Sequence, residues 1–242
     1  IGLGKEAATA FEKEGANLAI VARSADKIDN LKKSFNDPEK HMFFQLDLFE
    51  LDNVKKLTNN ILNQWSTLDI ILHCIGGSFQ LNETLINWND FAKNLMGNIG
   101  IGSEINKYIV PIMKKQGHGN IIHVGSMAGF EGTGSVPYNT AKAALLGYVR
   151  SLGKQLIEDG VIVSGILPGA FYGEDNSMFR FEYYKPEEYL EFVKSLPQQR
   201  MPNAKEFIPM IFMLSDPESK VLSGSLITMD GSQGKAHFNY SN

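Results

Sequence analysis

Short, continuously apolar runs alternate along the chain with longer stretches whose apolar residues recur every three or four positions. A continuous run is typical of a buried parallel strand, and the longer period is typical of a helix with one buried face. The alternation therefore predicts an α/β fold with a parallel sheet and helices on both faces. The expected strands are 17–22, 42–46, 68–74, 121–124, 161–167 and 226–229, and the main expected helices are 26–35, 88–113, 137–159 and 204–214.

The long helical stretch 88–113 contains three glycines, at positions 97, 100 and 102. Each glycine inside a helix costs up to about 1 kcal/mol relative to alanine. We therefore expect a local distortion of this helix around Asn98.

The composition indicates a single domain spanning residues 1–242. A chain of 242 residues with 43% hydrophobic content can bury one substantial core. The net charge is −4, with acidic and basic residues mixed along the chain. Because no basic run is present, we expect neither a nucleic acid nor a membrane partner, but a small molecule.

The single cysteine, Cys74, excludes an intrachain disulfide and is expected to be buried and inert. The five histidines show no metal-ligand spacing, so no metal site is expected. No apolar run approaches the roughly 18 residues of a transmembrane helix, and no signal-peptide pattern opens the chain. A cytoplasmic location is the expectation.

The strongest candidate chemistry lies between Ser126 and Lys142. Tyr138 and Lys142 are four residues apart in a segment rich in helix formers, so both side chains should project from one helix face. A nearby ammonium would lower the pKa of the phenol from about 10 and make Tyr138 a usable proton donor and acceptor. Ser126 follows an apolar run and should lie at the carboxyl end of a strand, where ligands bind in open α/β sheets.

The combination of Ser126, Tyr138 and Lys142, followed by a strand that leads into Pro168-Gly169, resembles the short-chain dehydrogenase/reductase family. The resemblance extends over the whole chain and implies a doubly wound, Rossmann-like parallel sheet. It also implies an enzyme that moves a hydride between a nicotinamide and a carbonyl or alcohol carbon. In such enzymes Ser126 and Tyr138 would bind the substrate oxygen, Tyr138 would act as acid and base, and Lys142 would bind the nicotinamide ribose.

Asn98 matches the position of the family's fourth catalytic residue, which holds a water that connects the lysine to solvent. Ile1 and Gly2 resemble the end of the family's glycine-rich loop, where helix N–H groups bind the cofactor diphosphate. The family's first strand precedes this loop. We therefore expect that the first strand is missing from the given sequence and that residues precede Ile1.

Arg23 and Ser24 follow a predicted strand at the position that discriminates between cofactors. A guanidinium there can bind a 2'-phosphate, which favours NADP(H) over NAD(H), although a solvated arginine is the alternative. The resemblance further implies that Asp47, with Leu48 beside it, contacts the adenine. Gly76 would leave space for the cofactor, and Pro168 and Gly169 would flank the nicotinamide.

Two segments depart from the family pattern. The usual Asn-Asn before the glycine is replaced by His73-Cys74, so hydrogen bonds near the cofactor should come from His73 or main chain. The threonine usually found after Pro168-Gly169 is absent. Both differences imply that individual cofactor contacts differ from the family pattern.

Residues 171–200 are dense in aromatic and charged side chains, which is typical of a substrate lid, although the aromatic rings could simply pack the segment down. A 3-oxoacyl thioester or a sugar derivative would suit its mixture of rings and charges. The resemblance implies a homo-oligomer, either a dimer or a homotetramer. The alternative function is a non-catalytic nucleotide-binding regulator of the same fold.

Overall fold

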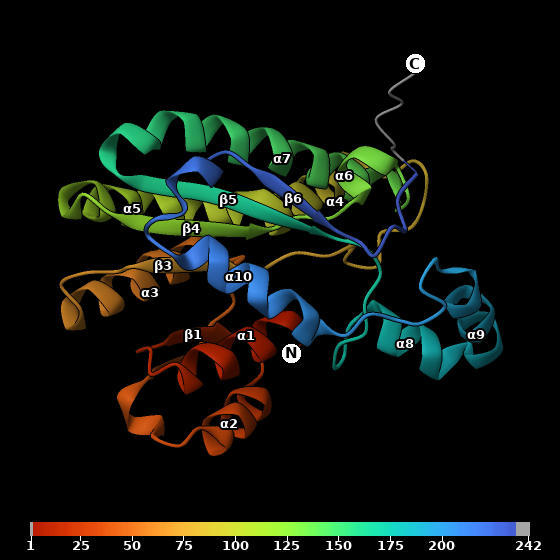
Figure 1. Cartoon of the computed structure of the whole chain (residues 1–242), viewed down its shortest axis with the longest axis horizontal. Coiled ribbons are helices and arrows are strands. Elements are labelled where there is room, and N and C mark those ends of the chain that lie inside the picture. The colour runs from red at the N-terminus through yellow and green to blue at the C-terminus, as the bar shows by residue number, and fades with distance from the viewer. Residues whose placement is uncertain (1, 236–242) are drawn as a thin grey trace.

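The computed structural model of the protein describes residues 2–235 and consists of parallel strands connected by helices (Figure 1). The strands are β1 (Ala19–Ala22), β2 (Met42–Gln45), β3 (Ile70–His73), β4 (Gly119–Val124), β5 (Val161–Pro168) and β6 (Leu226–Met229). The helices are α1 (Gly2–Lys13), α2 (Ala25–Ser34), α3 (Leu51–Gln64), α4 (Trp88–Leu95), α5 (Ile101–Gln116), α6 (Ala128–Glu131), α7 (Val136–Leu156), α8 (Ser177–Tyr184), α9 (Pro186–Ser195) and α10 (Ile208–Ser215). No helix within the described range is both long and apolar enough to cross a membrane.

Every strand pairing between these elements is parallel, as the alternation of segments predicts. Strands β3, β4, β5 and β6 lie side by side in that order. Within residues 2–235, β1 and β2 form a separate hydrogen-bonded pair. Parallel strands end at the same edge, so the segments that follow β3, β4 and β5 are brought together at one side of the molecule.

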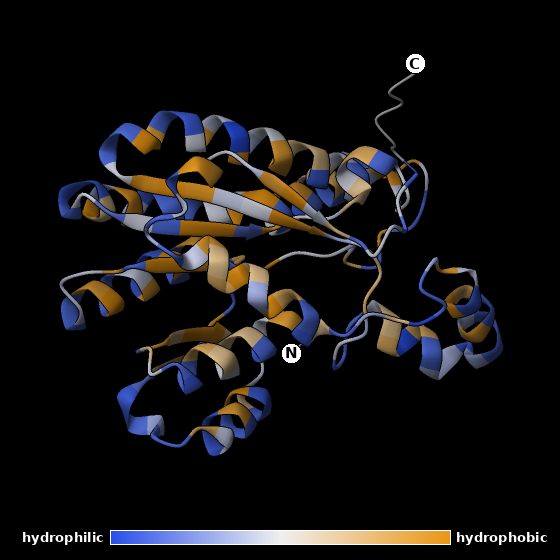
Figure 2. Ribbon diagram, viewed as in Figure 1, coloured by the Kyte–Doolittle hydropathy of each residue, from blue (hydrophilic) through white to orange (hydrophobic). Residues whose placement is uncertain are grey.

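Helices cover both faces of the four-stranded sheet, which confirms the predicted doubly wound α/β architecture (Figure 1). On one face, α5 and α7 pack on β4 and β5 through a cluster that includes Ile109, Val149 and Ile121. On the other face, α1 and α10 pack on the same strands through Leu3 and Ile211. Figure 2 shows the strands mainly in the hydrophobic colour, with hydrophilic residues on the outward turns of the helices.

A third cluster joins the β1–β2 pair to the rest of the molecule. Helix α3 contributes Val54, Leu57 and Ile61, which pack against residues of both strands and against Ile101 of α5. The apolar residues of α3 recur at helical spacing, so they all face inward. The β1–β2 pair is therefore fastened through α3 to the helix layer that also covers β4 and β5.

The helical stretch after Trp88 is not continuous, as its glycines predict. A π-helical turn over Met96–Gly100 separates α4 from α5, and the N–H of Ile101 bonds to the carbonyl of Met96. Gly97 is pressed against two aromatic rings, because a Cβ built on it would come 2.3 Å from Cζ of Phe79. Such single π turns inside helices are frequent at functional sites.

Residues 171–200 form two helices, α8 and α9, that stand beside the main body (Figure 1). Their aromatic rings pack largely on one another, with the Phe181 ring 5.8 Å from Tyr189 and 6.0 Å from Phe192. Most other side chains of these helices are exposed. The segment therefore has a small internal core of its own and few deep contacts with the sheet.

Candidate active site

Helix α7 carries both Tyr138 and Lys142. The helix begins after Ser135, with Pro137 in its first turn, where the missing N–H of proline does no harm. The Lys142 Nζ lies 5.7 Å from the centroid of the Tyr138 ring. Lys142 is only 3% exposed and donates a hydrogen bond of 3.0 Å to the carbonyl of Val124, at the end of β4. The ammonium is thereby fixed between α7 and the sheet edge.

Ser126 lies two residues beyond the end of β4, at the carboxyl edge of the sheet. Its Oγ accepts a hydrogen bond of 3.1 Å from the N–H of Ala128, and the hydroxyl is hydrogen-bonded to Tyr138. Two groups that can bind one oxygen atom of a ligand are thus held side by side.

Burial shifts the pKa values of both ionisable groups on α7. It raises the pKa of Tyr138 above 10, and the hydrogen bond from Ser126 only partly opposes this effect. It lowers the pKa of Lys142 from 10.5 to about 8. The predicted lowering of the Tyr138 pKa by Lys142 is therefore wrong for these residues by themselves, because desolvation has the largest effect on the phenol and only the Ser126 hydrogen bond opposes it.

Gly76, in the loop after β3, lies against Lys142 and against Asn98 of the π turn. A Cβ built on Gly76 would lie 2.6 Å from Oδ1 of Asn98 and 3.3 Å from Nζ of Lys142, and its φ of +138° also requires glycine. Asn98, in the π turn, is buried and accepts a hydrogen bond of 3.0 Å from the N–H of Gly77. Its Nδ2 donates to the carbonyl of Gly77 and to that of Asn94. The structure thus brings the four expected catalytic residues, Asn98, Ser126, Tyr138 and Lys142, to one edge of the sheet.

The expected phosphate-binding end is the start of α1. Helix α1 begins at Gly2, whose φ is +54°. A Cβ built on Gly2 would have only the carbonyl oxygen of Glu174 within 4 Å, at 3.8 Å. Unpaired N–H groups at such a helix start favour an anion. Ile1 lies outside the described residues.

Arg23 and Ser24 connect β1 to α2. Arg23 is exposed, and Ser24 is the N-cap residue of α2 but its side chain makes no capping hydrogen bond. A guanidinium and a hydroxyl are therefore available at the end of β1, which fits a phosphate monoester.

Asp47 and Leu48 follow β2. The Asp47 carboxylate is exposed and accepts a hydrogen bond of 3.1 Å from the N–H of Phe49. The Leu48 side chain is buried in the cluster around α3. Any contact of Leu48 with a ligand would therefore use its main chain.

The turn after β5 is held by a residue that the sequence motifs do not indicate. The carbonyl of Pro168 accepts a hydrogen bond from the N–H of Met127, and Gly169 N–H donates to Met229. Gln233 bonds both main-chain groups of Ala170, at 2.7 and 3.0 Å. No spacing rule relates positions 63 residues apart, so this contact could not be found from the sequence.

The His73 side chain is engaged with Asn106 and His123, so of the two expected sources of hydrogen bonds near the cofactor, His73 or main chain, only the main chain is left. His73 is buried, its Nε2 is 2.9 Å from Oδ1 of Asn106, and its ring stacks on His123 at 4.4 Å. Burial lowers the pKa of His73 to about 4 and that of His123 well below its usual range. The register of β3 on β4 pairs the two histidines directly, which explains the stack. Cys74 is exposed, so the prediction of a buried side chain is wrong. Desolvation raises the pKa of its thiol to about 12, which agrees with the predicted inert thiol.

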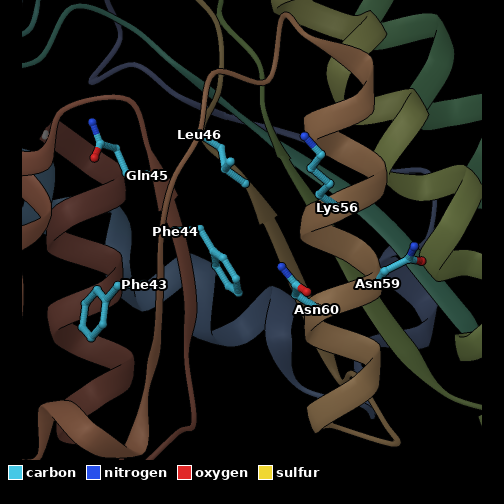
Figure 3. A pocket seen from close by; sticks show the side chains of 7 residues that line it. All are labelled: Phe43, Phe44, Gln45, Leu46, Lys56, Asn59 and Asn60. Carbon is cyan, nitrogen blue, oxygen red and sulfur yellow. The ribbon is translucent and has the colours of Figure 1, made fainter.

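A cavity of about 410 Å³ between β2 and α3 lies outside this group (Figure 3). It is lined by Phe43, Phe44, Gln45, Leu46, Lys56, Asn59 and Asn60. None of the expected site residues borders it, so it adds nothing to the candidate site. Among residues 2–235, no group of three or more His, Cys, Asp or Glu side chains is placed to hold a metal ion.

Comparison with known sequences gives one consistent result. A family model described as short chain dehydrogenase matches residues 1–180. An uncharacterized oxidoreductase of Thermotoga maritima is 30% identical over 238 residues, which cover 95% of this chain and 92% of the relative. The 3-oxoacyl-[acyl-carrier-protein] reductase FabG of the same organism is 24% identical over 233 residues, covering 95% and 92%.

Solved structures share the fold. The L-sorbose reductase from Gluconobacter frateurii, complexed with NADPH and L-sorbose, superposes with a TM-score of 0.85 at 22% identity, covering 98% of this chain and 94% of that one. Levodione reductase superposes with a TM-score of 0.87 at 21% identity, covering 98% and 95%. These structures have the same Rossmann-like arrangement of a parallel sheet between helices.

Proposed function

The chain belongs to the short-chain dehydrogenase family of oxidoreductases, and we propose that it interconverts a carbonyl and a secondary alcohol with NADP(H) as cofactor. The observation that carries the proposal is the buried ammonium of Lys142 beside the phenol of Tyr138. Placing a lysine in such a site is costly, and perturbed ionisable groups cluster where chemistry is done.

The residues present fit a nicotinamide dinucleotide. The start of α1 at Gly2 would hold the diphosphate, Arg23 with Ser24 would hold a 2'-phosphate, and Lys142 would hold the nicotinamide ribose. Asp47 and Leu48 would lie at the adenine, and Gly76, Pro168 and Gly169 would leave room for the rest. Several structural relatives are bound to NADP or NADPH, which supports the choice of cofactor. When bound, the nicotinamide would supply a hydride to a carbonyl carbon or accept one from an alcohol.

The protein residues would handle the oxygen and the proton. Ser126 and Tyr138 would hydrogen-bond the substrate oxygen, and Tyr138 would pass its hydroxyl proton to that oxygen as the alcohol forms. The raised pKa keeps Tyr138 neutral near pH 7, so the protein alone is prepared for the reductive direction. The phenolate left behind would be stabilised by Ser126 and by the nearby ammonium, and Asn98 would hold the loop at Gly77 in place.

The relatives and the lid segment support two proposals for the substrate class. Enzymes similar to this chain include a 3-oxoacyl-[acyl-carrier-protein] reductase and an L-sorbose reductase. A 3-oxoacyl thioester and a sugar derivative therefore remain the two proposed classes. The segment 171–200 would cover the bound substrate.

The test follows NADPH oxidation by its near-ultraviolet absorbance across a panel of 3-oxoacyl thioesters, ketoses and simple ketones. Activity with any member, lost by at least about a hundredfold in Tyr138→Phe, supports the proposal. Cofactor binding without turnover of any substrate would favour the non-catalytic regulator.

We also propose that the protein is a homo-oligomer, a dimer or a tetramer, paired through the helices α4, α5 and α7 as in many members of its family. Sedimentation velocity at micromolar concentration tests this proposal. A monomer at that concentration would contradict it.

A further inference from the structure

The start of the lid segment is tied to two different helices by consecutive acidic residues. Glu174 forms an ion pair with Lys5 of α1, and Asp175 forms one with Lys27 of α2, at 2.6 Å. The backbone here also lies close to α1, since a Cβ on Gly173 would come within 3.1 Å of Cα of Gly2. The lid is thus anchored at the mouth of the expected cofactor site.

Lys27 belongs to the same short segment as the proposed 2'-phosphate ligands. It lies in the first turn of α2, three residues after the N-cap Ser24 and four after Arg23. Its side chain extends towards Asp175, which follows the residue whose carbonyl faces Gly2. The ammonium of Lys27 therefore lies between the start of α2 and the start of α1.

From this geometry we infer that Lys27 is shared between Asp175 of the lid and the 2'-phosphate of the cofactor. The inference rests on the proposed use of NADP(H). A bound 2'-phosphate draws the Lys27 ammonium away from Asp175, so the lid loses this contact to α2 only when the 2'-phosphorylated cofactor binds. Lys27 is then a specificity-determining residue, and Asp175 is the group that couples specificity to the lid.

The physical basis is competition between two anions for one cation. Both side chains of the Lys27–Asp175 pair are about 40% exposed, at 42% and 40%. Exposed ion pairs contribute little, so the exchange is easily driven by a doubly charged phosphate. Two neighbouring contacts do not involve Lys27: Arg180 donates to the main-chain carbonyl of Asp175, and Glu174 pairs with Lys5. The exchange therefore changes one contact of the lid and leaves these two in place.

The test measures binding of 2',5'-ADP and of 5'-ADP by calorimetry in the unmodified protein, Asp175→Asn, Lys27→Gln and the double variant. Asparagine is chosen because it tolerates the φ of +59° at position 175. We expect Asp175→Asn to tighten 2',5'-ADP binding about two- to fivefold, the range expected for an exposed pair. Lys27→Gln should weaken it by about tenfold or more, as for loss of a charge-assisted phosphate contact.

The ligand lacking the 2'-phosphate and the double variant make the test specific. Binding of 5'-ADP should change by less than about twofold in each variant, and Asp175→Asn should have no effect when Lys27 is already glutamine. Glu39→Gln is the matched control, since Glu39 pairs with Lys32 further along the same helix. Hydrogen exchange of residues 174–184 should rise with 2',5'-ADP and not with 5'-ADP.

Two results would overturn the exchange and leave the proposed function intact. One is that Asp175→Asn changes the affinities for 2',5'-ADP and 5'-ADP equally. The other is that Asp175→Asn still changes the affinity for 2',5'-ADP in the Lys27→Gln background. Failure of NADP(H) and of both ADP ligands to bind the unmodified protein would overturn the proposed function together with the inference.

Discussion

Gly76 and Asn98 approach each other so closely that the position of a Cβ on Gly76 would be 2.6 Å from the Asn98 Oδ1. The contact joins the loop after β3 to the π turn between α4 and α5, and it sits against the Lys142 ammonium. Because Gly76 has no side chain, the side chains of Asn98 and Lys142 can both lie close to its backbone.

We predict that Gly76→Ala lowers kcat by at least about tenfold, because the methyl group must displace Asn98 or Lys142 and small displacements of positioned groups cost up to about a hundredfold. Gly77→Ala is the matched control. Gly77 also has a positive φ, of +149°, but nothing lies within 4 Å of its added Cβ. Both variants carry backbone strain, so only the difference between them reports the contact. Equal kcat values in steady-state assays would contradict the prediction.

The π turn gives a prediction about stability. Alanine is a better helix former than glycine, yet Gly97→Ala should destabilise the protein by about 1–3 kcal/mol, since its methyl group would collide with Phe79 and Phe49. Gly147→Ala, on α7 with nothing within 4 Å, should instead stabilise by up to about 1 kcal/mol. Urea unfolding of both variants checks the opposite signs. A stabilised Gly97→Ala protein would show that the packing argument is wrong.

The buried lysine should make stability depend on alkaline pH. The pKa of Lys142 is about 8 in the folded protein and 10.5 as its ordinary value, so the unfolded chain binds more protons between these values. Stability therefore rises with pH over this window, on the order of 3 kcal/mol. Lys142→Met removes this contribution. Between pH 7.5 and 10, the free energy of unfolding of the unmodified protein should therefore rise by about that amount relative to the variant. If the two proteins give parallel curves of unfolding free energy against pH, measured by denaturant titration, the prediction is wrong.

The histidine stack predicts sensitivity to acid. The pKa of His73 is about 4 in the folded protein and 6.5 ordinarily, so stability should fall as pH decreases from about 6.5 to 4, on the order of 3 kcal/mol for this group. His123→Phe keeps a ring in the stack and removes a buried Nε2 that makes no hydrogen bond to the described residues. The variant has one buried histidine fewer to protonate, so its free energy of unfolding should decline less steeply as the pH falls. A decline as steep as that of the unmodified protein, followed by urea unfolding at several pH values, would contradict the role of the stack.

Cofactor preference gives the fifth prediction. Arg23→Asp replaces a cation by an anion at the end of β1, so it should weaken NADP(H) binding by about tenfold or more and shift the preference towards NAD(H). Fluorescence titration with both reduced cofactors measures the ratio. An unmodified protein with equal affinity for the two would contradict the role of Arg23.

The parts of the fold that could be predicted from sequence are those decided locally. The helical period placed Tyr138 and Lys142 on one face of α7, and the three glycines predicted the interruption at Asn98. The parallel sheet followed from apolar runs, which report burial on both faces. These signals lie within a few residues of the features they predict.

The parts that could not be predicted depend on contacts between distant segments. His73 and His123 meet only because β3 and β4 pair in one register. The pairing of Lys27 with Asp175 spans 148 residues, a separation at which no spacing rule applies. The pKa of Tyr138 was predicted in the wrong direction, since spacing reveals a neighbouring charge but not the extent of desolvation.

The π turn also determines how the side chains of α4 are rotated about the helix axis relative to those of α5. A π turn holds one residue more than the α-helical turn it replaces, and one residue corresponds to a rotation of about 100° around a helix axis. Asn94, on the near side of the turn, bonds the carbonyl of Ser78, and Asn106, on the far side, bonds His73 and Tyr148. Removing a single residue from 96–100 would rotate one of these asparagines out of reach of its partners. The length of this segment is therefore as constrained as its amino acids, and single-residue deletions should be tolerated here less well than substitutions.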